Sequence, residues 1–397
     1  MNTRPAIESP SEHAALSVTF NNDASRFAVG LDSGFCIFLS NSSQIQTARG
    51  TLMPIHQLYM NLTDSVFNAG IGLVQMMGNA NYLALAGGGR SPKYPQNKVI
   101  IWDDSKGKIA LEIATLTAVR GVQISKSRIA VVLQNSVRVY AFGKPPKPLA
   151  RYDTADNHFG LCCLTDKYLV FPGRTPGQVQ VVELATDSVS IIPAHSSNLR
   201  ALQLSSDGDL LATASEKGTI IRIFSTSSCA KLAERRRGSE SASIYSLRFS
   251  PSGTMLACTS DKGSLHIFGV PNPRKPRPGS PAPSPGGGST TKTEAPNKWG
   301  VLSNLPFGPF SDVYSFASTP FETGQEPLLP TNYPDRPSPV LGTSRPVKGV
   351  VGWIDETTLV VVGAGQDARW EKFVLREGED GGRLVLIREG WKKYLGN

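Results

Sequence analysis

The residues best suited to chemistry are three consecutive arginines and a glycine, Arg235-Arg236-Arg237-Gly238. A planar guanidinium group binds phosphate through two parallel hydrogen bonds, so this run can recognise a phosphorylated ligand. Adjacent side chains of an extended chain point to opposite sides, and Arg236 and Arg237 are therefore expected to face two different neighbours. An arginine run by itself is more often a solvated basic turn.

Histidines and small polar residues lie on both sides of the arginines. Thr213 and Ser215 would share one face of a strand, as would Ser264 and His266. Hydroxyl, imidazole and guanidinium groups together predict a pair of pockets for phosphorylated headgroups. Taken singly, each hydroxyl is more often a turn or sheet residue. The residues concerned are His195, Thr213, Ser215, Gly218, Thr219 and Arg222 before the arginines, and Ser260, Ser264 and His266 after them.

A repeat along the chain predicts the elements that would position these groups. Pairs of short apolar strands joined by polar or glycine turns recur seven times, and the middle ones repeat at roughly 40 residues, the period of a propeller blade. The pairs are 27–30 and 35–38, 82–86 and 98–102, 129–133 and 137–140, 168–171 and 178–182, 210–214 and 219–224, 255–259 and 264–268, and 359–362 and 368–373. The pattern predicts an all-β, seven-bladed β-propeller of WD-repeat-like four-stranded blades. Residues 18–20 are expected to complete the last blade.

A single domain, residues 14–397, is expected to follow a flexible N-terminus, residues 1–13. Residues 271–298 are rich in Pro, Gly and Ser, which predicts a disordered insertion. The next expected strand is 313–316, so the insertion would be a long loop within blade six. The apolar residues beyond it suit a membrane-inserting loop, with a spacer that merely rejoins the blade as the alternative. They are Trp299, Leu302, Leu305 and Phe307.

Composition narrows the class of protein. The net charge of +9 favours anionic partners: nucleic acid, acidic protein or phospholipid headgroups. No apolar run is long enough to span a membrane and no signal peptide is evident, so a cytoplasmic protein with peripheral membrane contact is expected. The five cysteines form no CxxC pair and the five histidines show no zinc spacing. We therefore expect no metal, no cofactor and no enzyme activity.

The sequence also resembles a known family, the PROPPINs, which are WIPI-type phosphoinositide-binding propellers. The resemblance is closest to the small-propeller subgroup and covers most of the chain except the blade-six insertion and residues 324–346. It is carried by the segments 20–23, 87–104, 171–174, 194–195, 212–219, 221–222, 236–238 and 260–268. The family has Phe or Leu before Arg-Arg-Gly, whereas this chain has Arg235.

The resemblance implies two headgroup sites on either side of the double arginine. The first would use His195, Thr213, Ser215, Gly218, Thr219, Arg222 and Arg236, and the second Arg237, Gly238, Ser260, Ser264 and His266. The implied ligands are phosphatidylinositol 3-phosphate and the 3,5-bisphosphate. A monomeric recruitment platform for autophagy and vacuolar or endosomal traffic is expected on pre-autophagosomal, endosomal or vacuolar membranes. Its expected partner is an autophagy lipid-transfer protein, with Asn21, Asn22 and Asp23 matching a contact region of relatives.

Three other readings remain open at this stage. The chain could be a protein-only WD-repeat-like scaffold without specific lipid binding. The basic pI also permits a nucleic-acid binder, although the basic residues are dispersed and no nucleic-acid partner is expected. A propeller enzyme is disfavoured because no acid pair, metal cluster or Ser/His/Asp arrangement is recognisable. The sequence does not distinguish the preferred phosphoinositide, the organelle or the protein partners.

Overall fold

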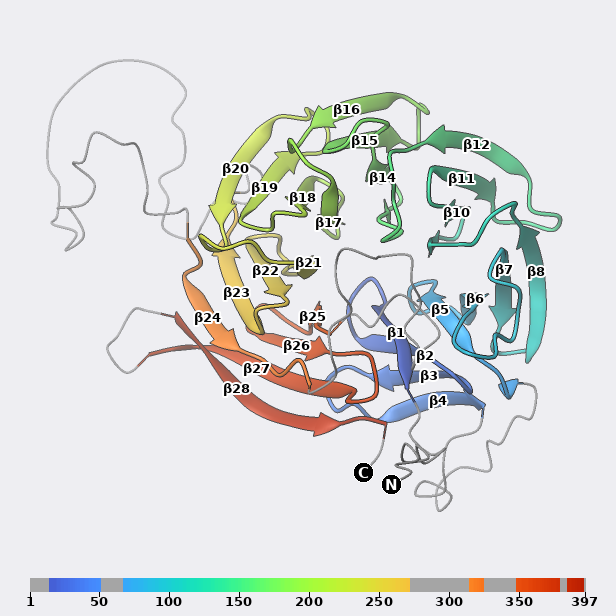
Figure 1. The fold of residues 1–397 in the computed structure, drawn as a ribbon, viewed down its shortest axis with the longest axis horizontal. Coiled ribbons are helices and arrows are strands. Elements are labelled where there is room, and N and C mark those ends of the chain that lie inside the picture. Colours follow the sequence, from blue (N-terminus) through green and yellow to red (C-terminus); the bar gives the residue numbers. More distant parts are fainter. Residues whose placement is uncertain (1–13, 51–66, 272–313, 325–347, 379–383, 396–397) are drawn as a thin grey trace, which may run out of the picture.

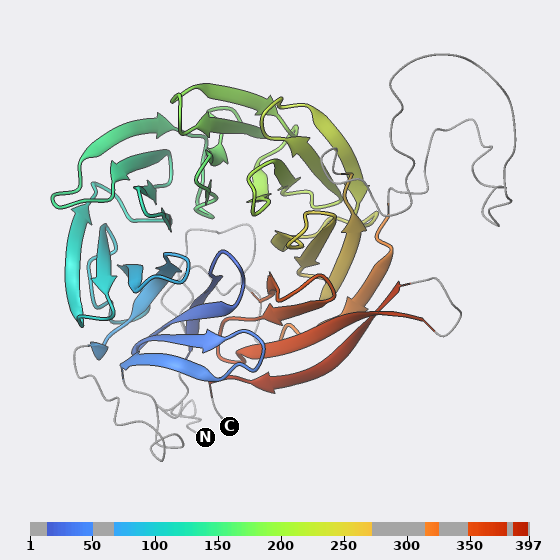
Figure 2. The same ribbon diagram turned by 180° about the vertical axis from the view of Figure 1, so that it is seen from behind.

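The computed structural model describes residues 14–50, 67–271, 314–324, 348–378 and 384–395. These residues form seven four-stranded antiparallel sheets arranged radially, so the predicted seven-bladed propeller is confirmed (Figures 1 and 2). The first strand of each blade lies near the centre and the fourth lies at the outer rim. The predicted flexible N-terminus 1–13 and, apart from residue 271, the predicted disordered insertion 271–298 lie outside the described residues, as does the predicted membrane-inserting loop with Trp299, Leu302, Leu305 and Phe307.

The strands follow the chain in order, four to a blade. Blade one comprises β1 (Ala15–Phe20), β2 (Arg26–Leu31), β3 (Gly34–Leu39) and β4 (Ile45–Gly50), and blade two β5 (Ile71–Met76), β6 (Tyr82–Gly87), β7 (Lys98–Asp103) and β8 (Lys108–Ala114). Blade three comprises β9 (Gly121–Ile124), β10 (Arg128–Val132), β11 (Ser136–Ala141) and β12 (Pro148–Asp153), and blade four β13 (Cys163–Leu164), β14 (Tyr168–Pro172), β15 (Gln178–Glu183) and β16 (Val189–Pro193). Blade five comprises β17 (Leu199–Leu204), β18 (Leu210–Ser215), β19 (Ile220–Ser225) and β20 (Lys231–Arg236). Blade six comprises β21 (Ile244–Phe249), β22 (Met255–Ser260), β23 (Ser264–Gly269) and β24 (Ala317–Pro320), and blade seven β25 (Val350–Trp353), β26 (Thr358–Val362), β27 (Arg369–Glu377) and β28 (Leu384–Lys393).

Each blade is sandwiched between two neighbours, so alternate residues of its middle strands face different blades. In blade five, Ala212 and Ile221 pack against blade six, together with Leu256 of that blade. Leu211 and Phe224 pack instead against blade four. This alternation buries both faces of the apolar strands and also determines which neighbour a polar side chain of the same strand meets.

Two details of the sequence-based prediction were wrong. Residues 18–20 do not complete the last blade: they lie in β1, which pairs with β2 of blade one, while blade seven draws all four strands from the C-terminal region. The expected strand at 313–316 starts later, because the strand that pairs with β23 begins at Ala317. Since β23 ends at Gly269 and pairs with β24, the fourth strand of blade six follows a long intervening segment.

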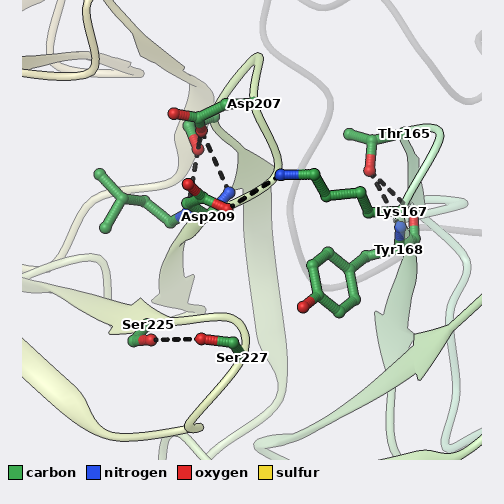
Figure 3. A network of polar contacts seen from close by, with 9 residues as sticks. Thr165, Lys167, Tyr168, Asp207, Asp209, Ser225 and Ser227 are labelled. Atoms are coloured by element: carbon green, nitrogen blue, oxygen red, sulfur yellow. Dashed lines mark hydrogen bonds and ion pairs between the residues drawn. The ribbon is translucent and has the colours of Figure 1, made fainter. Parts of the chain in front are cut away.

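Neighbouring blades are also linked through their β-turns. Lys167, in the turn between β13 and β14, donates to Asp209 in the turn between β17 and β18 at 3.3 Å (Figure 3). The second turn is braced by Asp207, which accepts from the Ser205 hydroxyl at 2.6 Å and from the Asp209 amide at 3.1 Å. These turns lie at the end of blade five opposite Arg236, since Leu210 pairs with Ser225 whereas Arg236 pairs with Ile220. The polar turns thus fix adjacent blades without using the arginine end.

No helix long and apolar enough to cross a bilayer occurs among the described residues.

Candidate functional site

The outer strand of blade five, β20, carries the arginines and ends with Arg236. Arg235 is buried and donates from Nε to the carbonyl oxygen of Gly269 in blade six, at 2.8 Å. Arg237 is also buried and donates from Nε to the carbonyl oxygen of Gly218 at 2.7 Å, while its Nη2 donates to the Glu240 carbonyl. Both side chains are therefore fixed by backbone oxygens, and the first of them holds blade five against blade six.

Arg236 is held differently from its two neighbours. Alternation along the strand places it on the face that carries Glu234, away from Arg235. Its side chain is half-buried and makes no hydrogen bond or ion pair with any described residue, although its backbone forms a bridge with that of Tyr314. An arginine whose backbone is fixed and whose guanidinium retains its donors is available to an anionic ligand.

A first polar cluster, His195, Thr213 and Arg222, lies between blades four and five. The His195 Nε2 and Thr213 Oγ1 atoms are 3.0 Å apart. Thr213 and Arg222 are paired across β18 and β19, and Arg222 donates from Nη1 to the Ala194 carbonyl oxygen at 2.6 Å. Glu234 binds Arg222 Nε at 2.8 Å. The first cluster is thus a connected network that keeps one arginine partly neutralised beside the more open Arg236.

The electrostatics of the first cluster favour a neutral imidazole. Burial and the nearby Arg222 charge lower the pKa of His195 to about 4. The Arg222 hydrogen bond lowers the pKa of the Glu234 carboxyl, which stays ionised. At neutral pH the positive charge of the first cluster therefore comes from arginine and not from histidine.

A second polar cluster, Arg237, Ser264 and His266, lies between blades five and six. The His266 ring is 3.0 Å from Ser264 Oγ through Nε2 and 3.1 Å from Ser315 Oγ through Nδ1. Burial, with a smaller contribution from the Arg237 charge, lowers the pKa of His266. The Arg237 charge therefore acts on the His266 ring across the boundary between blades five and six.

Gly218 fixes the turn between the two clusters. Its φ is +61°, and a Cβ there would lie 1.8 Å from the Ala242 carbonyl oxygen. No side chain fits, because the turn packs directly on the connection between blades five and six. The Gly218 carbonyl oxygen also accepts a hydrogen bond from Arg237 of the second cluster. The strand before this turn, β18, carries Thr213 of the first cluster, so the turn connects the two clusters.

The other residues predicted for the two sites have mainly structural roles. Ser215 and Ser260 are buried at the ends of β18 and β22, and each backbone carbonyl closes a turn by accepting from the amide of Gly218 or Gly263. The Thr219 carbonyl accepts from the Arg237 amide at 2.9 Å. A Cβ at Gly238 would meet no described atom within 4 Å. These residues shape the turns around the two clusters.

Sequence reasoning missed two side chains at the clusters. Glu234 was overlooked because a lone carboxylate beside arginines resembles an ordinary surface ion pair, yet its pairing across β19 and β20 puts it on Arg222. Ser315 was overlooked because it lies far from His266 in sequence, and only the pairing of β23 with β24 brings it there. The sequence did contain a signal for Glu234, because the Glu-x-Arg spacing of Glu234 and Arg236 puts both side chains on one face of a strand.

The predicted partner-contact residues divide into one buried and two exposed positions. Asn21 is fully buried and donates to Ser25 and Asn79, while its carbonyl accepts from Arg248 of blade six at 3.1 Å. Asn22 and Asp23 are exposed on the turn between β1 and β2. Asn21 is therefore a structural residue, and contact with a partner is open to the other two.

A metal centre is not part of either cluster. No group of three or more His, Cys, Asp and Glu residues suited to holding a metal ion occurs in the part of the chain that the structure describes. The chemistry of the clusters is that of guanidinium, imidazole and hydroxyl donors, which suits an oxyanion ligand.

The fold and these clusters define a class: a seven-bladed propeller with adjacent histidine–hydroxyl clusters joined by an arginine strand. A family model described as PROPPIN matches residues 91–293. The chain is 55% identical over 327 residues to SVP1-like protein 2 of Emericella nidulans, a match that covers 81% of this chain and 99% of the relative. The protein therefore belongs to the PROPPIN family.

Two further comparisons concern a more distant relative and the fold. Autophagy-related protein 18e of Arabidopsis thaliana is 34% identical over 269 residues, which cover 66% of this chain and 68% of that protein. A structure of Kluyveromyces lactis Hsv2 superposes with a TM-score of 0.70 at 22% identity, covering 96% of this chain and 99% of the other. The second likeness supports the propeller fold.

Proposed function

We propose that this protein binds phosphoinositide-containing membranes through two headgroup sites, one at each polar cluster. The observation that carries the proposal is the arrangement at the end of β20: the Arg236 guanidinium has no hydrogen-bond partner among the described residues and lies beside the first cluster, while the Arg237 charge acts on His266 in the second. The inferred ligands are inositol rings phosphorylated at the 3-position, either phosphatidylinositol 3-phosphate or the 3,5-bisphosphate.

Two sites on one strand end would make membrane binding multivalent. Once the first headgroup is bound, the second binds from the same surface at a high effective concentration, so two weak sites give tight attachment. Basic residues near the surface add about 1 kcal/mol each toward anionic lipid. Peripheral, reversible attachment follows from these contributions and requires no spanning segment.

The remaining blades would act as a recruitment platform and not as an enzyme. A relative is named autophagy-related protein 18e, which favours a role in autophagy, and we also infer a role in vacuolar or endosomal traffic. We infer a cytoplasmic protein that reaches pre-autophagosomal, endosomal or vacuolar membranes, with an autophagy lipid-transfer protein as partner. The exposed residues Asn22 and Asp23 are candidates for that contact.

Liposome flotation tests the proposal with Arg236→Thr. This variant removes an arginine whose side chain has no described protein partner, so the fold should persist. We expect wild type to float with vesicles containing phosphatidylinositol 3-phosphate and not with neutral phosphatidylcholine vesicles. Loss of one charged hydrogen-bonding group, worth about 1.5–3 kcal/mol, should weaken binding by roughly tenfold to a hundredfold.

Arg151→Thr is the matched control. Arg151 lies on the outer strand β12 of blade three, and its side chain is 65% exposed. It should bind like wild type if the clusters are specific. Equal flotation of wild type with both vesicle types, unchanged by Arg236→Thr, would instead favour a protein-only scaffold.

A further inference from the structure

Three polar side chains at the second cluster, Ser315, His266 and Ser264, are connected in a chain of hydrogen bonds. The His266 ring has a hydroxyl at each nitrogen: Ser264 Oγ at 3.0 Å from Nε2 and Ser315 Oγ at 3.1 Å from Nδ1. All three residues belong to blade six, with Ser264 and His266 on β23 and Ser315 just before β24. Ser264 and His266 share a strand face, which is the face toward Arg237.

The proton on the imidazole decides what Ser264 offers to a ligand. Burial and the nearby Arg237 charge lower the pKa of His266, so at neutral pH the ring carries one N–H and one lone pair. If Nε2 carries the proton, it donates to Ser264 Oγ, and the Ser264 hydroxyl is free to donate outward. If Nδ1 carries it, Ser264 must donate to Nε2 and presents only lone pairs, which repel an anion.

We propose that Ser315, His266 and Ser264 form a directed hydrogen-bond relay in which Ser315 donates to Nδ1, Nε2 donates to Ser264, and Ser264 donates to a phosphate oxygen of the headgroup. Ser315 is then a positioning residue of the second site, acting through the tautomer of His266. The proposal rests on the function proposed above. It identifies the Ser264 hydroxyl as the donor that gives the second site its preference for an anion.

The relay depends on Ser315 because the useful tautomer leaves a lone pair on Nδ1. In the described part of the chain, Ser315 provides the hydrogen bond at that atom. Without its hydroxyl, the same tautomer would bury an unpaired acceptor, and an unpaired buried group costs about 1–3 kcal/mol. The ring would then favour the opposite tautomer, and Ser264 would turn its hydroxyl inward.

The first cluster has no such relay, which sets the two sites apart. Thr213 is fully buried, and its hydroxyl lies 3.0 Å from His195 Nε2 and 3.4 Å from the Arg222 carbonyl oxygen. A hydroxyl that donates to that carbonyl has no proton to offer a ligand. Donation to a headgroup from the hydroxyl bound to the histidine is therefore a property of the second cluster.

Calorimetric titration with a soluble short-chain phosphatidylinositol 3-phosphate tests the relay. Arg236→Thr serves as the common background, because it removes the arginine of the first site and leaves the second. In this background Ser315→Ala should weaken binding by roughly tenfold, the effect of one lost hydrogen bond near 1.4 kcal/mol. Ser315→Thr keeps the hydroxyl and should retain the affinity.

Ser318→Ala is the matched control. Ser318 is an exposed serine on β24 whose backbone pairs with His266, so it shares the strand environment, whereas the ring nitrogens are hydrogen-bonded to Ser315 and Ser264. It should bind like the background. Nitrogen NMR of the His266 ring should show the Nε2–H tautomer with ligand bound in the background and in Ser315→Thr.

The outcomes separate the relay from the headgroup function. If the background protein binds the lipid and Ser315→Ala binds it equally well, or if the bound ring is protonated at Nδ1, the relay is overturned and the headgroup site stands. If neither wild type nor the background binds the soluble lipid, both proposals fall.

Discussion

At the scale of single residues, the three arginines have three different roles. Arg235 stands where the sequence pattern of the family has Phe or Leu. The structure shows it buried with Nε on the Gly269 carbonyl oxygen, so it forms a hydrogen bond to the next blade. Arg237 is fixed by Gly218 and Glu240, and Arg236 is the open member. A substitution at each should therefore affect a different property.

His195 gives the protein a pH-dependent stability. Its pKa is about 4 in the folded chain and about 6.5 when unfolded, so between those values only the unfolded chain binds the proton. Stability from this group is complete above pH 6.5 and is lost as the pH falls toward 4, by at most about 3 kcal/mol. Urea unfolding measured at pH 7 and pH 5 should show the loss.

His195→Gln supplies the comparison. Glutamine does not titrate, so this variant should lose less stability than wild type across the same pH interval. Identical losses in the two proteins would show that other groups account for the pH dependence.

At the scale of elements, one position on the third strand of a blade determines which polar side chain lies between that blade and the preceding one. Equivalent positions hold Arg222 in blade five, His266 in blade six and Glu371 in blade seven, by the register of each sheet. Glu371 is buried, accepts from the Glu322 amide beside blade six and pairs with Arg388. A buried carboxylate at this position of the third strand makes the interface between blades six and seven unsuited to an anion.

The turn between β18 and β19 is the element on which both clusters depend. Gly218→Ala would place a Cβ against the Ala242 carbonyl oxygen, and the turn would have to move. We expect a loss of about 3 kcal/mol or more in unfolding free energy, together with weaker lipid binding, because the Gly218 carbonyl holds Arg237. Urea unfolding and liposome flotation would measure the two effects.

Gly107→Ala controls for backbone conformation alone. Gly107 has a φ of +59°, close to that of Gly218, and no described atom lies within 4 Å of its Cβ position. It should cost only about 1 kcal/mol, the strain of a positive φ. Equal losses in the two variants would mean that the contact with Ala242 is unimportant.

At the scale of the whole molecule, the blade count followed from the sequence and the ring closure did not. Strand pairs such as 210–214 and 219–224 carry a local pattern, so their pairing could be predicted. The partners of β1 depend on three-dimensional packing: residues 18–20 look the same in sequence whether they join blade one or blade seven. The clusters were partly predictable for the same reason, since Thr213 and His266 lie in repeats whereas Ser315 meets His266 only in the fold.

Arg248 connects blade six directly to blade one, although blade seven lies between them in the ring. It lies on β21 of blade six and donates from Nη2 to the carbonyl oxygens of Asn21 at 3.1 Å and Asn22 at 2.8 Å, on the first turn of blade one. Arg248→Met keeps the aliphatic stem and removes both bonds, so it should destabilise the protein by about 2 kcal/mol. Urea unfolding would measure this loss.

Arg151→Met is the comparison for Arg248→Met, because Arg151 is largely exposed on the outer rim. It should change the unfolding free energy by no more than about 0.5 kcal/mol. A similar small change in Arg248→Met would show that the bonds to blade one contribute little to stability.

The seam between blades one and seven has a consequence for how such a chain can be arranged. No strand crosses it: Ala15 bridges to Gly365, Trp370 donates to the Ser40 carbonyl at 2.8 Å, and the Tyr394 ring packs edge-on against Phe38. Every blade is therefore an unbroken stretch of chain, and a gene that began at blade three and ended at blade two would encode the same seven sheets. The chain would then run directly from blade seven into blade one, and the interface between blades two and three would become the place where the ring opens.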